Sequence, residues 1–420
     1  MEYDVIIVGA GLAGLACAKA VHERGKSFLL LEAEEQPGGR VRTDSEQGFL
    51  LDRGFQVLQT AYPEAQTALD YDQLDLRPYP AGVLIRANGR FHTIADPRRH
   101  PSQFLATATS AIGSFKDRYL VLKLANAVRS VSLPAIFQEN EQPAIDFLEQ
   151  WGFSHLFIQQ FFQPFFAGAC LDPAIRASSR VLKYIMRMFA SGDAAVPAKG
   201  MGQIASQMAA ALPDEHIRYV SRVAEITNGS VTLQYGTTLH GRMIVLATPL
   251  PVVQQLLQLP EQARMSPPHR PPMGESCLYF NAGKWRPPSQ LPFLVLNGDG
   301  EGPINNLAFP SLVSPDYAPN GETLVAAVCL QSSPSRELEN EVRAQLVSWF
   351  GVEAQHWELL RAMHIPYGLP NQEPPTANPY QLPISYNTRI RICGEYQSLP
   401  SIQWALLSGR RTGEIVCDEL

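Results

Sequence analysis

Apolar and polar residues follow one another along this chain in blocks that predict both buried strands and helices. The first block, residues 4–8, is a short β-branched run typical of a strand buried on both faces. A glycine-rich turn follows, then helix-forming residues over 15–24 and a second apolar strand over 27–31 that ends at Glu32. This order predicts a βαβ unit at the start of the chain.

Two later stretches have different patterns. Residues 98–190 contain few glycines and show the apolar spacing of helices. Residues 270–385 mix strand-like runs with one expected helix over 335–350. The strands expected there are 277–280, 291–296 and 323–330. Prolines cluster over 260–292 and 366–383, where they indicate stiff connections rather than regular elements.

The glycine turn of the βαβ unit has the spacing that a dinucleotide requires. Gly9 allows the tight turn, Gly11 lets the backbone approach a pyrophosphate, and Gly14 lets helix and strand pack closely. Free N–H groups and the helix dipole attract phosphate at this helix start. The carboxylate of Glu32 suits an adenosine ribose and would repel a 2′-phosphate, which disfavours NADP.

A second glycine cluster separates a long dinucleotide from a short one. Gly38 and Gly39 allow close backbone approach to another part of the same ligand, and Arg40 and Arg42 can neutralise its phosphates. Residues 48–56 then indicate a strand that ends in a glycine turn. The arrangement suits a ligand that lies extended along the protein.

Composition narrows the classes further. The 420 residues are enough for two or three domains, and 34 Lys and Arg against 40 Asp and Glu give a net charge of −6, which argues against a nucleic-acid partner. The six cysteines are scattered without a metal-ligand spacing, so no metal site and a reducing compartment are expected. Neither a basic leader nor about 20 consecutive apolar residues occurs, which predicts a cytoplasmic protein.

The run from 4 to 42 resembles the N-terminal signature of the FAD-dependent amine oxidase superfamily, which includes monoamine oxidases, protoporphyrinogen oxidases and phytoene-type desaturases and isomerases. Residues 52–55 are similar to its "D-x-G" element, and 197–201 resemble the segment that precedes the return to the FAD domain. Residues 390–409 resemble the C-terminal motif, in which a helix N-terminus faces the flavin pyrimidine edge. The resemblance is closer to the desaturase-like branch.

This resemblance implies an α/β fold in which a discontinuous, Rossmann-like FAD-binding domain carries an α+β substrate domain. The FAD-binding pieces are expected at 1–75, 200–260 and 385–420. The substrate domain is expected at 76–199 and 261–384, with a helical part over 98–190 and a mixed sheet part over 270–384.

The resemblance also implies which residues bind FAD, and it assigns no catalytic residue. Glu395 would bind the ribityl chain, and the backbone of Val223 would contact the adenine. The full set of implied FAD-binding positions is Gly9, Gly11, Leu12, Ala13, Gly14, Glu32, Ala33, Gly38, Gly39, Arg40, Gly54, Phe55, Val223, Ala247, Gly394, Glu395 and Ile402.

Three departures from the family pattern bear on the reaction. Trp404 replaces a common glycine, so its indole either turns away from the flavin or reshapes the site wall. Cys277 or Leu278 stands near the place of the lysine that monoamine oxidases use, and Ser401 near the place of a cage tyrosine. These departures favour a desaturase, dehydrogenase or isomerase that acts on a hydrophobic polyene or cyclic substrate. A flavin amine oxidase and an FAD-holding binding protein remain the alternatives.

Three local features allow two interpretations each. The phenylalanine-rich segment 157–166 is either a core helix ending at a proline or part of the wall of an apolar substrate cavity. The basic stretch 98–130 is either a solvated helix face or a peripheral contact with an anionic membrane. His364, Tyr367 and Tyr396 are either acid–base groups or ordinary packing residues.

Overall fold

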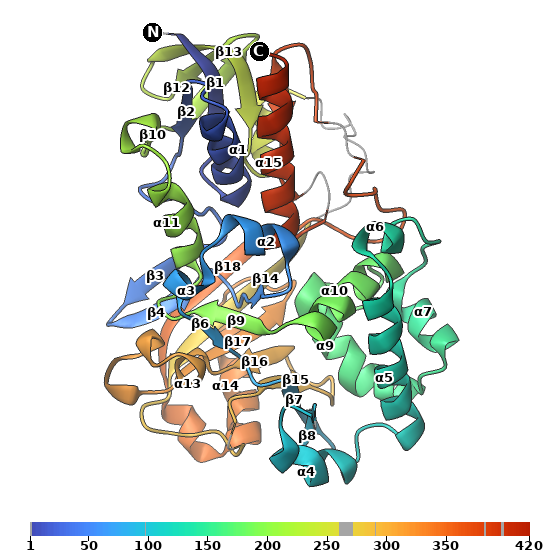
Figure 1. The fold of residues 1–420 in the computed structure, drawn as a ribbon. Helices are drawn as coiled ribbons and strands as arrows, with labels where there is room; N and C mark the ends of the chain where they lie inside the picture. The colour runs from blue at the N-terminus through green and yellow to red at the C-terminus, as the bar shows by residue number, and fades with distance from the viewer. Residues whose placement is uncertain (1, 97, 260–271, 290, 382–383, 396–398) are drawn as a thin grey trace.

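The structure is a computed structural model that describes residues 2–96, 98–259, 272–289, 291–381, 384–395 and 399–420. Figure 1 shows an upper part that contains both chain ends, and a larger lower part. Four prolines of the first predicted stiff connection (Pro260, Pro267, Pro268 and Pro271) and the candidate Tyr396 lie outside the described residues.

The upper part is built on a seven-stranded sheet. β1 (Glu2–Val8) lies between β2 (Phe28–Leu31) and β13 (Thr238–Leu246) and is parallel to both. The outer strands are β10 (Ile217–Arg218), β12 (Ser230–Leu233), β11 (Val223–Thr227) and β19 (Ile390–Ile392). Strands from three distant parts of the chain therefore form one sheet, as a Rossmann-like domain with insertions requires.

The first and last long helices pack against each other beside this sheet. α1 (Leu12–Glu23) and α15 (Ile402–Asp418) lie side by side in Figure 1. A Cβ at Gly409 would overlap the carbonyl oxygen of Ala13, so only glycine allows the two helices to approach this closely. The C-terminal helix thereby begins close to the loop that opens α1. The other helices of this part are α2 (Pro63–Ala68), α3 (Tyr71–Leu74), α11 (Gly202–Ala210) and α12 (Leu250–Leu256).

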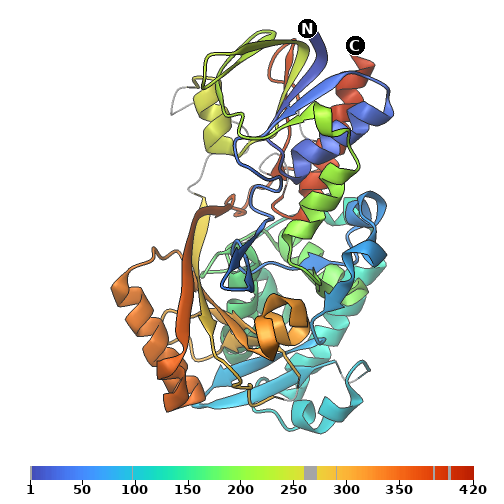
Figure 2. The same ribbon diagram turned by 90° about the vertical axis from the view of Figure 1, so that its left-hand side faces the viewer.

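A second seven-stranded sheet forms the core of the lower part (Figure 2). Its strands, in spatial order, are β18 (Glu358–Leu369), β14 (Met273–Asn281), β17 (Leu324–Leu330), β16 (Asn306–Ala308), β15 (Leu294–Asn297), β7 (Gly82–Ala87) and β8 (Arg90–Ala95). All neighbours are antiparallel except β15 and β7. α13 (Pro310–Val313) and α14 (Arg336–Phe350) belong to the same part. Two small sheets join β3 (Thr43–Glu46) to β4 (Phe49–Asp52), and β5 (Leu58–Gln59) and β6 (Leu76–Pro78) to β9 (Ala194–Pro197).

The predicted helical part forms a separate group beside the second sheet (Figure 1). Its helices are α4 (Phe104–Ala108), α5 (Phe115–Ser130), α6 (Leu133–Ile136), α7 (Ala144–Trp151), α8 (His155–Phe157), α9 (Gln163–Cys170) and α10 (Ser179–Ser191). α5 begins with a capping box, in which Ser114 Oγ accepts from Asp117 N at 3.2 Å and Asp117 Oδ2 accepts from Ser114 N at 2.8 Å.

The phenylalanine-rich segment corrects one expectation. A helix that ends at Pro164 was the first interpretation, but the chain stays helical through α9. One π-helical turn over Ile158–Phe162 comes immediately before Pro164, which occupies the first turn of α9. Proline cannot donate a hydrogen bond to the preceding turn, and the hydrogen-bond pattern of the helix changes at the π-helical turn just before it.

The expected elements of the second sheet agree with the structure within a few residues, with one exception. Residues 366–383 were expected to hold no element, yet β18 runs through Pro366 to Leu369. β18 is an edge strand, and an edge strand can leave one side of its backbone without ladder bonds. The missing N–H of Pro366 is therefore acceptable there.

Candidate functional site

One large cavity of about 1670 Å³ connects the two parts of the molecule. It is lined by the glycine turn of the βαβ unit, by the first residues of α15, and by residues of the second sheet and the helical group. The residues that line it come from nearly the whole sequence, from Val8 to Ala405. Residues from both predicted domains therefore line the same cavity.

The dinucleotide end of the cavity has an open cradle. A Cβ added at Gly11 would meet no atom within 4 Å, and Gly11 lies against Gly38 in an isolated parallel bridge. Gly11 is also the N-cap of α1, whose first turn contains no acidic residue. Backbone N–H groups and the positive helix end therefore face free space that a pyrophosphate can fill.

The Glu32 carboxylate is fixed beside this cradle. Its Oε2 accepts from Ala10 N at 2.8 Å and its Oε1 accepts from Glu34 N at 3.0 Å, while Glu32 itself lines the cavity. A carboxylate has about four lone-pair sites, so acceptor capacity remains after these two bonds. It suits the hydroxyls of a ribose.

The other end of the predicted cofactor site joins the first and last segments of the chain. Arg40 donates to Glu395 in an ion pair, and its second nitrogen donates to Gly368 O at 2.6 Å. Ser401 is the N-cap of α15, and its Oγ accepts from Trp404 N at 3.4 Å. The N-terminus of α15 thus opens onto the same cavity, through Ser401 and Ile402.

Two of the predicted FAD-binding residues do not line the cavity. A Cβ at Gly14 would overlap the carbonyl oxygen of Gly9, so Gly14 permits close packing of α1 on the loop. Gly54 leaves room for a carboxylate described below. The predicted residues that line the cavity are Gly9, Gly11, Leu12, Ala13, Glu32, Ala33, Gly38, Gly39, Arg40, Phe55, Val223, Ala247, Gly394, Glu395 and Ile402.

These observations fit FAD. An open glycine cradle that suits the pyrophosphate, an oriented carboxylate that suits the adenosine ribose and a helix N-terminus that suits the flavin all line one cavity. The volume exceeds the roughly 300–1,000 Å³ of most small-molecule sites, so space remains beyond a dinucleotide. FAD bound here would supply a two-electron acceptor.

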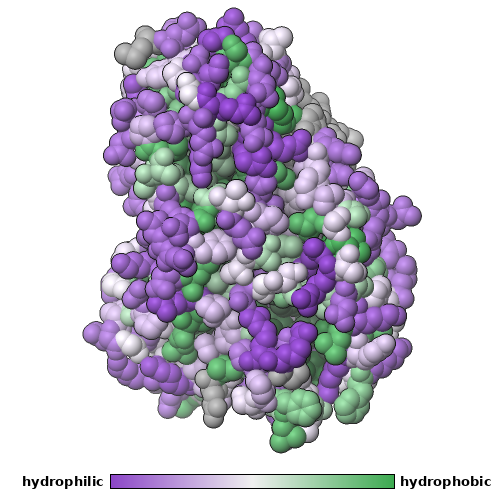
Figure 3. All heavy atoms as spheres, viewed as in Figure 1, coloured by the Kyte–Doolittle hydropathy of each residue, from purple (hydrophilic) through white to green (hydrophobic). Residues whose placement is uncertain are grey.

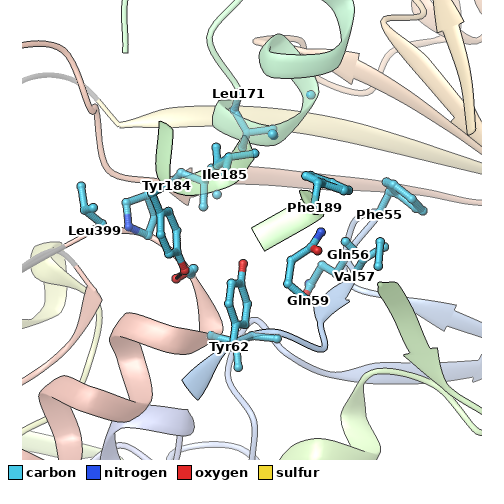
Figure 4. Close-up of a pocket in the computed structure, with 18 of the residues that line it drawn as sticks. Phe55, Gln56, Val57, Gln59, Tyr62, Leu171, Tyr184, Ile185, Phe189 and Leu399 are labelled. Carbon is cyan, nitrogen blue, oxygen red and sulfur yellow. Dashed lines mark hydrogen bonds between the residues drawn. The ribbon is translucent and has the colours of Figure 1, made fainter. Parts of the chain in front are cut away.

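The remaining wall of the cavity is largely aromatic and aliphatic (Figure 4). Figure 4 shows Tyr62 extending toward the centre, with Tyr184 and Ile185 beyond it and Phe189 near Phe55. From the phenylalanine-rich segment, Phe161 and Phe165 line the cavity, and Phe162 and Phe166 are buried in the core. Phe157 belongs to the buried core and also lines the cavity, so the segment contributes to both.

Two tyrosines stand parallel near the start of α15. The ring centroids of Tyr62 and Tyr184 are 6.1 Å apart with planes within 5°, and the Tyr184 hydroxyl lies 3.2 Å from Ser401 Oγ. Burial raises the pKa of Tyr62 to about 12, so this phenol is neutral at physiological pH. The pair fills part of the place where Ser401 replaces a family tyrosine.

One cavity residue, Glu275, was missed in the sequence analysis. Cys277 and Leu278 were the expected residues of this strand, but Glu275 is the β14 residue that lines the cavity. Its carboxylate has no hydrogen bond or ion pair to any described residue. Burial raises its pKa to about 7. The available signal was a lone acid in the otherwise uncharged strand 273–281.

Three other sequence candidates are placed away from the cavity. Trp404 is fully buried against Phe137, Tyr184 and Tyr380 and does not line the cavity, so its indole turns away. Tyr367 lies under the Arg40 guanidinium, 5.7 Å from the ring centroid. His364 Nδ1 is 3.5 Å from Ser276 Oγ. These contacts are those of packing residues.

The mouth of the cavity lies at α4 and α5. Phe104, Phe115 and Leu122 line the cavity and are also 61%, 80% and 55% exposed, so they mark the place where it meets solvent. Leu105 and Tyr119 extend the same exposed apolar surface. In Figure 3 apolar side chains gather at the lower end of the molecule, where Figure 1 places α4, below a hollow. Within the described residues, no helix has the length and hydrophobicity needed to cross a bilayer.

Much of the basic charge near this mouth is already paired. Arg98 bonds Asp96 at 2.7 Å, Arg99 pairs with Asp193, and Arg118 donates to the carbonyl oxygens of Ala108 and Ser110. Lys116, Lys123 and Arg129 form no ion pair with a described residue. The apolar rim, rather than net charge, is therefore the main feature of this surface.

Comparisons with known proteins agree with this geometry. The profile of the family described as flavin containing amine oxidoreductase matches residues 12–417. Protoporphyrinogen oxidase 2 of Arabidopsis thaliana is 26% identical over 156 residues, which are 34% of this chain and 30% of that protein. Putrescine oxidase of Kocuria rosea is 32% identical over 98 residues, 22% of this chain and 20% of that protein. The matched part is less than a third of either relative's length.

Solved structures share the fold at low identity. An oxidoreductase from Methanosarcina mazei superposes with a TM-score of 0.72 at 15% identity, covering 98% of this chain and 99% of that one. Reduced UDP-galactopyranose mutase superposes with a TM-score of 0.67 at 15% identity, covering 99% of this chain and 95% of that one. The predicted fold class is confirmed, as are the predicted cofactor, FAD, and enzyme class, oxidoreductase. The chain belongs to the flavin-containing amine oxidoreductase family.

Proposed function

We propose that this protein is an FAD-dependent desaturase, dehydrogenase or isomerase that transfers hydride between a carbon of an apolar, polyene or cyclic substrate and the flavin. The observation that carries the proposal is the single cavity of about 1670 Å³, which continues from the glycine cradle into an aromatic and aliphatic chamber. A chamber of this kind binds a hydrophobic molecule mainly by removing its surface from water. The predicted FAD-binding residues and domain boundaries form part of the same proposal.

The chain's own residues have three tasks in this reaction. The cradle at Gly11, together with Glu32, holds the dinucleotide, and Arg40 with Glu395 fixes the loop beside the ribityl position. The N-terminus of α15 favours negative charge on a reduced flavin. The apolar wall orients the substrate and excludes water, which would otherwise compete.

An amine oxidase is the second candidate, because the parallel Tyr62 and Tyr184 rings are arranged like the two walls of an aromatic cage. A flat group held between two ring faces needs about 7 Å between them, twice the carbon contact distance of about 3.5 Å. The observed centroid separation of 6.1 Å is smaller, and the Tyr184 hydroxyl contacts Ser401. The pair therefore fills its own space, which supports hydride transfer from an apolar carbon over amine oxidation.

The surface at the cavity mouth supports a peripheral contact with an anionic membrane. A substrate dissolved in the bilayer would then enter beside Phe104 and Phe115 without crossing water. The unpaired Lys116 and Lys123 would lie near lipid headgroups.

Anaerobic mixing of the purified holoprotein with separate panels of polyenes, cyclic apolar compounds and amines tests the proposed function. We expect loss of the oxidised flavin absorbance, or isomerised product, with a member of the apolar panels only. Flavin reduction by amines alone would favour the amine oxidase. A flavin that dithionite reduces but that no compound of the three panels reduces or turns over would favour a protein that only holds FAD.

A further inference from the structure

We propose that Glu275 is a catalytic acid–base residue that exchanges a proton with the substrate in the cavity. The inference deepens the proposed function and rests on it, because it names the group that completes the chemistry in the same site. It starts from the position of one carboxyl group that has no hydrogen bond or ion pair to any described residue.

The fold places Glu275 on β14, an inner strand of the second sheet. β14 lies between β17 and β18, where Glu275 stands opposite Leu330 and Ile365. The strand shifts register against β18 between Met273 and Glu275. The extra residues of this bulge lie on β18, between Ile365 and Leu369. On the facing strand, the Glu275 side chain lines the cavity and is only 7% exposed.

The neighbouring loop makes room for this carboxylate. A Cβ at Gly54 would overlap Glu275 Oε1, so the glycine after Asp52-Arg53 leaves the space that the carboxylate occupies. Gly54 also has a φ of +84°, which a larger residue adopts only with strain. The segment 52–55 resembles the family's "D-x-G" element, and its Phe55 lines the same cavity as Glu275.

A buried carboxylate without a partner lowers the stability of the folded protein, so its presence indicates a function. Leaving such a group unpaired costs stability, and buried charges in proteins are normally paired. Most of the wall around Glu275 is apolar, and no described cation bonds it. Unpaired groups of this kind, when they face a cleft, are candidates for proton transfer.

The titratable neighbours of Glu275 do not replace it in this role. Burial raises the pKa of Cys277, Tyr279 and Cys329 on β14 and β17, so these groups stay neutral. On β18, the other strand beside β14, His364 faces Ser276 rather than Glu275.

The groups on the loop before Gly54 are also held by partners of their own. Asp52 accepts hydrogen bonds from Thr43, Tyr317 and Met201, and Arg53 pairs with Asp44 at 3.5 Å. Glu275 is therefore the carboxyl group near this loop that remains free to bind a proton from a ligand.

The proposed step is part of a desaturation, in which two hydrogens leave adjacent carbons. One of two adjacent substrate carbons loses a hydrogen with its bonding electrons, and bound FAD would supply the acceptor for this hydride. The other carbon loses a proton to the Glu275 carboxylate, and the electron pair of that C–H bond becomes the new double bond. Glu275 then releases its proton to solvent.

A measurement without substrate tests whether Glu275 is coupled to the cofactor. The flavin midpoint potential of the holoprotein is measured from about pH 5 to about pH 9 in the wild type, Glu275→Gln and Glu358→Gln. Glu358 is the matched control, a carboxyl on the adjacent strand β18 outside the cavity. Above about pH 7, two-electron reduction of the wild type or of the control should bind up to one more proton than reduction of Glu275→Gln.

An identical proton count in all three proteins, each with full FAD, would overturn the proposal while leaving the proposed function intact. Absence of FAD, or a flavin that no apolar compound reduces, would instead overturn the proposed function. If Glu275→Gln does not fold, infrared titration of Glu275→Asp decides. The carbonyl band of a carboxylic acid that titrates near neutral pH must shift in this variant, and an unshifted band contradicts the proposal.

Kinetics with a substrate found by anaerobic mixing separate proton transfer from binding. A proton-transfer role predicts that Glu275→Gln lowers kcat by about 100- to 10,000-fold with KM nearly unchanged. A rise in KM with unchanged kcat would show that Glu275 anchors a polar group of the substrate, and it would overturn the proposed role.

Discussion

Glu275 Oε1 occupies the space that a side chain at position 54 would fill, so Gly54 and Glu275 are sterically coupled across the boundary between the two parts of the molecule. The pair links a loop beside the predicted flavin position to the wall of the apolar chamber. The lack of a side chain at Gly54 therefore leaves the space that the Glu275 carboxylate occupies.

Substitution of this glycine should displace the acid. Gly54→Ala places a methyl group against Oε1 and forces a non-glycine residue to a φ of +84°. We expect a loss of about 1–3 kcal/mol in unfolding free energy and a changed proton count during flavin reduction. Gly25→Ala is the control, because Gly25 also has positive φ but a Cβ there would meet no atom within 4 Å. Wild-type proton uptake in Gly54→Ala would contradict the coupling.

The pH dependence of stability should carry the signature of Glu275. Its pKa is raised by burial from 4.5 to about 7, so between these values the folded state binds more protons than the unfolded state. Stability from this group is therefore present at low pH and is lost as pH rises toward 7. We expect chemical unfolding to show that Glu275→Gln gains up to about 3 kcal/mol relative to wild type between pH 5 and pH 8. A constant difference across that range would contradict burial of an unpaired acid.

Substitutions of two glycines in the same turn should have different effects, one on FAD binding and the other on stability. Gly11→Val puts a side chain into empty space in the cradle, so the apoprotein should keep its thermal stability and lose FAD. Gly14→Ala overlaps the Gly9 carbonyl oxygen and should destabilise the fold by about 1–3 kcal/mol. Thermal melting and bound-flavin absorbance distinguish the two. A Gly11→Val protein that retains full FAD would show that the pyrophosphate lies elsewhere.

The apolar rim should control membrane binding. Replacing Phe104 and Leu105 with Ser removes two exposed side chains of α4 and should abolish flotation with vesicles that contain anionic lipid. Val352→Ser, at an exposed apolar position far along the chain, should float like the wild type. If the wild type does not float, the proposed membrane contact is wrong.

More of the residues that line the cavity at its proposed cofactor end than at its apolar end could be named from the sequence. Strand, turn and helix around Gly9 and Gly14 are local in sequence, so their chemistry follows from spacing alone. The positions of Glu395 and Ile402 followed from the family resemblance, because the glycine-mediated packing of α15 on α1 is not visible in spacing.

The substrate end depends on contacts between distant segments. Glu275 was missed because its place in the cavity wall depends on contacts with distant segments, the loop at Gly54 and the strand β18. The division of the phenylalanine-rich segment between core and cavity depends on a single π-helical turn. Trp404 turned away from the site because Phe137, Tyr184 and Tyr380, from three distant segments, enclose its indole.

The central claim is that the beginning, middle and end of this chain bind one FAD along one cavity. The most direct test is the visible absorbance of the purified protein before and after incubation with excess FAD, followed by quantification of the released flavin. The account predicts a yellow protein with one FAD per chain. A protein that remains colourless after reconstitution would contradict it.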